Sequence, residues 1–242
     1  MKTIQKLGIH KPTGLRKQIL LVAMLCCLSL LGGCSSMEQQ QDANSAALAY
    51  LERKYGEPFT YHSPWGDSMS GTREFWTTCE SFPDQRVLVQ VENYRQSGRI
   101  FRDNYLAVKY QEQVVDFFQN LTASVLGETN IFYKVIDEGA STDLSANATF
   151  AEYLADGHAP IIVTAEVRAS NFISKEHAET IMEILLESCP YFYFTLVVVD
   201  DDLFGTFDDS TISRHIALHE FVHYASMTRI AEESKIRWID GE

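Results

Sequence analysis

Basic residues are scarce in this chain of 242 residues. Lys and Arg total 20 against 33 Asp and Glu, so the net charge is −13 with neutral histidine. A surface of that sign repels phosphate groups, so the composition disfavours binding to nucleic acid. The sequence also lacks a C-x-x-C pair, a nucleophilic serine elbow and a phosphate-cradling glycine loop. The chain therefore offers no signature of thiol redox chemistry, serine hydrolysis or nucleotide binding.

The first 33 residues differ from the rest of the chain. Residues 1–17 carry five basic side chains and no acidic one, and residues 18–31 form an apolar run. This order is typical of a secretory signal, and the run is short for a transmembrane helix. Because the segment holds five positive charges and no negative one, the chain without it has a net charge of −18.

The segment closes on Leu31-Gly32-Gly33-Cys34, which resembles the lipobox of bacterial lipoproteins. The resemblance implies that Cys34 is the mature N-terminus, carries a diacylglyceryl thioether and anchors the chain to a membrane, with the rest in the cell envelope outside the cytoplasm. Ser35 after it implies the outer membrane in a Gram-negative cell, or the outer face of the cytoplasmic membrane in a Gram-positive cell. The alternatives are a plain signal peptide cut elsewhere and an uncleaved anchor.

Beyond Cys34 the chain has only two cysteines, Cys79 and Cys189. In an exported protein they could form one disulfide, closing a loop of about 110 residues and stabilising the fold by a few kcal/mol. The alternative is two separate, buried thiols. The polar residues 34–46 predict a flexible tether, and a globular domain follows over residues 47–242.

Hydrophobic periodicity predicts an α+β domain. It comprises an N-terminal helix, a three-stranded antiparallel meander, a long central helix, β-α-β units and a C-terminal helix. The predicted helices cover residues 42–55, 103–126, 149–157, 174–189 and 210–233. The predicted strands cover residues 58–66, 72–80, 86–94, 130–137, 159–169 and 191–200, the last of them apolar throughout and therefore central. The long helix is also where two subdomains would meet.

One catalytic signature is present, within RHIALHEFVHYASM at residues 214–227. His219, Glu220 and His223 spell H-E-x-x-H, which on a helix presents two imidazoles to one zinc and a glutamate to the metal-bound water. The pattern resembles the zincin metalloproteases, which implies His219 and His223 as ligands and Glu220 as the general base. No third ligand is recognisable downstream. The alternative is a core helix on which these histidines and His215 face the interior.

Acidic and aromatic clusters are the remaining candidates. The acids at the end of the last predicted strand could bind Ca²⁺ or Mg²⁺ or complete the zinc site, or they could cap a helix. The aromatics could bind sugar or a partner strand, or form core. The acids are Asp200, Asp201, Asp202, Asp208 and Asp209. The aromatics are Tyr61, Trp65, Phe75 and Trp76 on the meander, and Tyr191, Phe192, Tyr193 and Phe194 on the central strand.

The sequence therefore predicts a lipid-anchored envelope protein whose domain binds an envelope protein or a small molecule, without catalysis and without a cofactor. The competing prediction is a zinc-dependent hydrolase or peptidase that uses His219, Glu220 and His223.

Overall fold

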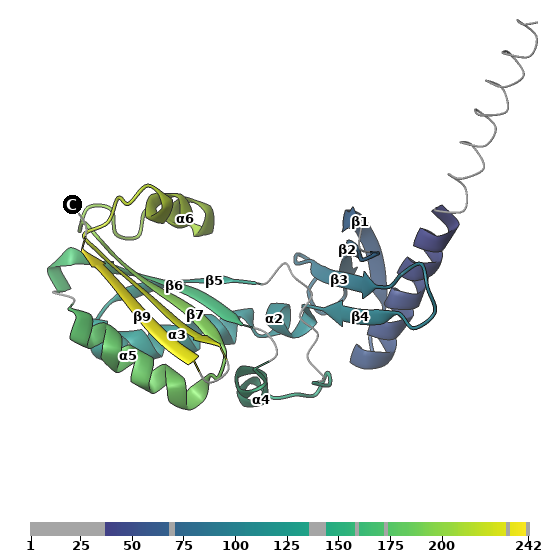
Figure 1. Ribbon diagram of the computed structural model, residues 1–242, viewed down its shortest axis with the longest axis horizontal. Coiled ribbons are helices and arrows are strands. Elements are labelled where there is room, and N and C mark those ends of the chain that lie inside the picture. Colours follow the sequence, from purple (N-terminus) through teal and green to yellow (C-terminus); the bar gives the residue numbers. More distant parts are fainter. Residues whose placement is uncertain are drawn as a thin grey trace, which may run out of the picture.

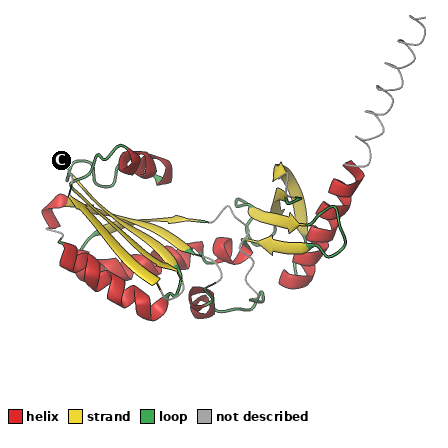
Figure 2. Ribbon diagram, in the orientation of Figure 1, coloured by secondary structure: helices red, strands yellow, loops and turns green. Residues whose placement is uncertain are grey.

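The computed structural model describes residues 37–67, 71–135, 144–157, 160–171, 174–230 and 233–240. It confirms the α+β class, with two sheets at opposite ends of the long axis and helices packed on both (Figures 1 and 2). The sheets are joined through the short helix α2 (Tyr105–Lys109), and most of the core is one continuous cluster that includes residues of both.

The N-terminal sheet is an antiparallel meander in the order β1-β2-β3-β4. Three of its strands match the predicted meander, because apolar and polar residues alternate along each of them. The fourth strand was not predicted, since it has only four residues. The strands are β1 (Phe59–Asp67), β2 (Arg73–Cys79), β3 (Val87–Glu92) and β4 (Ile100–Asp103).

An N-terminal helix, described over residues 37–55, covers one face of this sheet (Figure 2). It begins earlier than predicted, so the prediction of a flexible tether is wrong over residues 37–46. A four-residue apolar repeat starts before residue 46, the predicted end of the tether. Its members Ala43, Ala47, Leu51 and Tyr55 are all buried in the core.

The second sheet has the order β5-β6-β7-β8-β9, with β6 and β7 parallel and the other neighbours antiparallel. The central position predicted for the apolar strand is confirmed, because β7 is the middle strand. Its side chains alternate between a core shared with α3 and α5 and a smaller core shared with α6, on opposite faces of the sheet (Figure 1). The strands are β5 (Thr129–Lys134), β6 (Ile161–Arg168), β7 (Phe192–Val199), β8 (His223–Ile230) and β9 (Glu233–Asp240). The helices are α3 (Gln111–Leu126), α5 (Lys175–Ser188) and α6 (Asp209–Ala217).

The long helix predicted over residues 103–126 is divided into α2 and α3 at Tyr110, whose φ of −101° and ψ of 10° depart from helical values. The ring of Tyr110 packs against Phe150 and Tyr153 of α4 (Phe150–Ala155). Its hydroxyl donates a hydrogen bond to the Ala148 carbonyl. These contacts hold α4 beside the junction of α2 and α3.

The predicted C-terminal helix over residues 210–233 is wrong beyond Ala217. Only α6 is helical, and the antiparallel pair β8 and β9 completes the sheet. The residues after position 222 alternate with period two: Ala225 and Met227 are buried in the main core, whereas Tyr224 packs on the opposite face. Helical spacing and strand spacing both fit such a short stretch, and pairing with the central strand decides between them.

The disulfide considered as one alternative for Cys79 and Cys189 is not formed. Both cysteines are buried free thiols, one at the end of β2 in the first sheet and the other directly after α5 on the second. Burial raises the pKa of both thiols, that of Cys189 to about 11. The alternative of two separate small core residues therefore describes them.

A buried acid, Asp103, joins the N-terminal helix to the sheet and to α2. Its carboxylate is 2% exposed and accepts hydrogen bonds from the Tyr55 hydroxyl at 2.6 Å and the Lys54 ammonium at 3.0 Å. It also accepts one from the Tyr105 amide at 3.1 Å, in the first turn of α2. Three segments of the chain thus meet on one carboxylate.

Replacing Asp103 with alanine should lower the free energy of unfolding by about 3 kcal/mol, because it leaves the Lys54 ammonium largely buried without a counter-charge. Adding Lys54→Met should recover part of that loss, because no unpaired cation then remains. Urea unfolding measures all three variants. Asp84→Ala, which removes an exposed carboxylate, is the control. An equal loss in Asp103→Ala and this control would contradict the role of the cluster.

Stability should fall as the pH rises above about 10. Burial alone would lower the pKa of the Lys54 ammonium, but the adjacent Asp103 carboxylate raises it above its ordinary value. Burial and the same carboxylate raise the pKa of Tyr55, and burial raises the pKa of Tyr133 to about 12. Folded protein keeps these protons where the unfolded chain has lost them, so their contribution is complete below pH 10 and disappears as the pH rises through the raised values.

Urea unfolding at pH 7, 10 and 12 measures this loss. Tyr133→Phe should make the decline shallower between pH 10 and 12, whereas Tyr61→Phe, at an exposed position, should leave it unchanged. Stability that stays constant from pH 7 to 12 would contradict the prediction.

Candidate functional site

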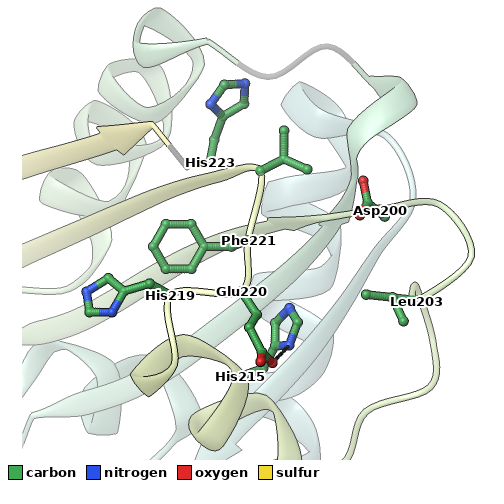
Figure 3. Close-up of a pocket in the computed structure, with 8 residues that line it drawn as sticks. Asp200, Leu203, His215, His219, Glu220, Phe221 and His223 are labelled. Atoms are coloured by element: carbon green, nitrogen blue, oxygen red, sulfur yellow. Dashed lines mark ion pairs between the residues drawn. The ribbon is translucent and has the colours of Figure 1, made fainter. Parts of the chain in front are cut away.

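A cavity of about 610 Å³ lies where the central strand β7 ends and the chain enters and leaves α6 (Figure 3). All three residues of the H-E-x-x-H pattern line it, together with the first acid after β7 and with His215 from α6. The full lining is Asp200, Leu203, His215, His219, Glu220, Phe221, Val222 and His223. The structure therefore brings the predicted site residues to one cavity, although not on one helix.

The H-E-x-x-H pattern is divided between a helix cap and a strand. His219 follows α6 with a φ of 58°, in the left-handed region. Its amide donates to the Ile216 carbonyl and the Glu220 amide donates to the His215 carbonyl. This pair of bonds is a Schellman motif, which ends a helix at a residue of positive φ. His223 lies beyond the cap, as the first residue of β8.

The cap contains a contact between a histidine and a carboxylate where such motifs usually have an apolar contact. Nδ1 of His215 lies 3.2 Å from a carboxylate oxygen of Glu220, and the His215 side chain is 9% exposed (Figure 3). The His215 ring also packs against Phe207, with centroids 4.7 Å apart. Nε2 of His215 is buried and has no hydrogen-bond partner among the described residues. Glu220 thus contacts a histidine outside the motif.

The two histidines of the motif are directed apart. In Figure 3 the Phe221 ring lies between His219 and His223, whose imidazoles point in different directions. The His223 ring packs against Trp238 of β9, and that of His219 lies beside Phe221. Over the part of the chain that the structure describes, no three His, Cys, Asp or Glu side chains form a group that could hold a metal ion. The one-helix geometry on which a zincin site depends does not occur here.

The acidic cluster caps and fastens the loop between β7 and α6. Asp208 is the N-cap of α6 and accepts from the amides of Ser210 and Thr211, which lowers its pKa to about 2. Asp201 accepts from the Ser170 amide at 3.0 Å, and this bond holds its pKa below the ordinary value. Asp200 lines the cavity. Helix capping, the alternative considered for these acids, therefore describes Asp208.

A fully buried carboxylate holds the same loop on the sheet. Glu166 of β6 is 0% exposed and accepts from the Asn130 side-chain amide at 2.8 Å and from the Gly205 backbone amide at 3.0 Å. Next to it, the Arg168 guanidinium lies 4.0 Å from the centre of the Phe204 ring. Sequence reasoning missed Glu166, although one signal was available: it is the only acid within an otherwise uncharged strand segment, residues 160–167.

A second cavity, of about 490 Å³, lies on the other side of α6 against β5 and β6. Its lining combines half-buried apolar side chains of the sheet, including Phe132 and Ile162, with Lys134, Thr164 and Ser213. The helix α6 thus has a cavity on each side, and its position on the sheet determines the shape of both.

The aromatic candidates fall into two groups. Phe75 of β2 and the phenylalanines of β7 are buried in the core, as the core alternative predicts. Trp65 is 54% exposed and packs edge-on against Trp76, with ring centroids 5.3 Å apart. Trp65 and Trp76 are thus a surface pair on the N-terminal sheet.

No family model matches the chain. No curated protein matches it either. Among solved structures, the crystal structure of a DUF5037 family protein from Ruminococcus gnavus ATCC 29149 is 13% identical and covers 78% of this chain and 92% of its own, with a TM-score of 0.37. A likeness this distant carries neither a fold nor a function to this chain. No helix in the described ranges is both long and apolar enough to cross a membrane.

Replacing His219 with glycine should raise the free energy of unfolding by about 1 kcal/mol, because glycine adopts positive φ without the steric clash of a Cβ atom. His219→Ala is the matched control, since it removes the same imidazole but keeps the strain. Urea midpoints measure the difference, and elemental analysis of all three proteins reports bound zinc. Equal midpoints in the two variants, with zinc bound only by the unmodified protein, would favour a metal site over a helix cap.

Proposed function

We propose that this chain is a lipid-anchored protein of the cell envelope whose folded part binds a partner without catalysis. The observation that carries the proposal is the order of the N-terminal features: five basic residues, an apolar run and then Leu31-Gly32-Gly33-Cys34. Acyl chains on Cys34 would hold the protein on a bilayer without a spanning helix.

The binding role is supported by the cavity beside α6. Its lining offers acidic, imidazole and aromatic side chains from Asp200, His215, His219 and Phe221. Such a cavity suits a small polar molecule or a polar loop of an envelope protein. The zinc hydrolase alternative requires His219 and His223 on one helix, but α6 ends at Ala217 and His223 begins β8. No observation favours it as a second function.

Lipidation is tested by producing the full chain in a bacterium fed labelled palmitate. Cys34→Ala should abolish both the label and the partition of the protein into the membrane fraction, because the thiol is the atom that carries the diacylglyceryl group. Cys27→Ala, which changes a cysteine of the apolar run, should retain both. Mass spectrometry of the mature N-terminal peptide then identifies the modified residue. An unmodified Cys34 in membrane-associated protein would refute the proposal.

A further inference from the structure

Three exposed apolar side chains lie on the N-terminal helix and the sheet that it covers. Met37 is 63% exposed, Trp65 54% and Ile100 46%. Single exposed apolar residues are ordinary on protein surfaces, so their grouping is what matters. Here three of the largest exposed apolar side chains of the described residues come from three different elements, the N-terminal helix, β1 and β4.

Side-chain contacts bring these elements to the same end. Arg99, just before β4, forms an ion pair with Asp42 of the helix at 2.5 Å. Arg73, the first residue of β2, donates to the side chain of Asn44 at 2.7 Å. The start of β2 and the residue just before β4 therefore lie beside the first part of the helix, the part that contains Met37.

The proposed anchor lies within reach of this end. Cys34 precedes Met37 by three residues, and three residues span at most about 11 Å even when fully extended. A lipid on Cys34 would therefore keep the start of the helix, and the β3–β4 turn near it, close to the bilayer surface. This step rests on the proposed function.

Most of the negative charge lies in the C-terminal part of the chain, away from the proposed anchor. Residues 37–103 hold ten acidic and seven basic side chains, a net charge of −3, whereas residues 104–242 hold 23 and eight, a net charge of −15. At the tip, Arg99 neutralises Asp42 and Arg102 neutralises Glu92 through ion pairs. Anionic lipids repel the C-terminal part far more than this end.

We infer that this end is a second membrane contact: Met37, Trp65, Arg95 and Ile100 form a bilayer-contact face that rests in the headgroup layer next to the lipid anchor. Tryptophan concentrates at that depth because its ring is apolar and its N–H is polar. Arg95 is exposed on the β3–β4 turn and can hydrogen-bond to lipid phosphate. The face orients the anchored protein with its acidic C-terminal part directed away from the membrane.

The experiment uses lipidated full-length protein in vesicles of phosphatidylcholine, with or without brominated acyl chains. The variant Trp76→Phe/Trp238→Phe keeps Trp65 as its only tryptophan, and Trp65→Phe/Trp76→Phe keeps Trp238 of β9 in the other sheet. Brominated lipid should quench Trp65 emission severalfold more than Trp238 emission. Equal quenching in the two variants, with lipid on Cys34 confirmed by mass, overturns the contact face and leaves the proposed function standing. Absence of lipid on Cys34 overturns both.

A second measurement keeps all core residues and does not depend on the single-tryptophan variants. Trp65→Glu should speed transfer of the lipidated protein between vesicles by at least about tenfold, because the variant loses the burial of a large aromatic ring in the headgroup layer. Ile184→Glu, at an exposed apolar position on α5, should leave the transfer rate unchanged. Far-UV circular dichroism confirms that both variants fold. Equal transfer rates of the two variants contradict the contact face.

Discussion

The carboxylate of Asp103 is the point on which the arrangement of the molecule depends. It ends β4, accepts from Lys54 and Tyr55 at the end of the N-terminal helix, and accepts from the first turn of α2 through Tyr105. A charge this deeply buried is tolerated only when its partners are in place. The helix, the first sheet and the connection to the second sheet therefore have one mutually consistent arrangement around it.

In the second sheet, too, a buried carboxylate fixes a neighbouring segment of the chain, here beside the cavity. The loop leading to α6 packs Leu203, Phe204 and Phe207 against the smaller core on this face. Glu166 fixes the loop through the Gly205 amide, and Asp208 starts the helix by capping it. The left-handed residue His219 then ends the helix after nine residues and returns the chain to β8. The cavity lies at the end of the helix where His219 is, and Leu203 of the loop also lines it.

Local pattern predicted much of the fold. The strands β1, β2, β3 and β7 alternate clearly or are continuously apolar, and α5 begins where Ser174 predicts, so each was placed nearly correctly. The prediction for the stretch from α6 to β9 was wrong, because histidines four residues apart fit one face of a helix as well as they fit a helix cap followed by a strand. The choice depends on pairing of β8 with β7, a contact between segments about thirty residues apart.

The candidate site was predictable in membership but not in geometry. The sequence identified His219, Glu220 and His223, and the structure places all three on one cavity. The sequence could not identify His215 as the partner of Glu220, because the two side chains meet only once the Schellman motif has formed. Nor could it identify Glu166 as a structural acid, since its partners lie 36 and 39 residues away in the sequence.

The N-terminal helix has a consequence for where the cavity can act. Its described 19 residues are about 28 Å long at 1.5 Å per residue, and they pack along the first sheet from Arg99 to Asp103. A helix fixed in this way is a rigid spacer, because it cannot bend without exposing core. In physiological salt, charges are screened within about 8 Å. In a chain anchored at Cys34, the acidic C-terminal part would stand several screening lengths from the bilayer, and its cavity would sample bulk solution instead of the lipid surface.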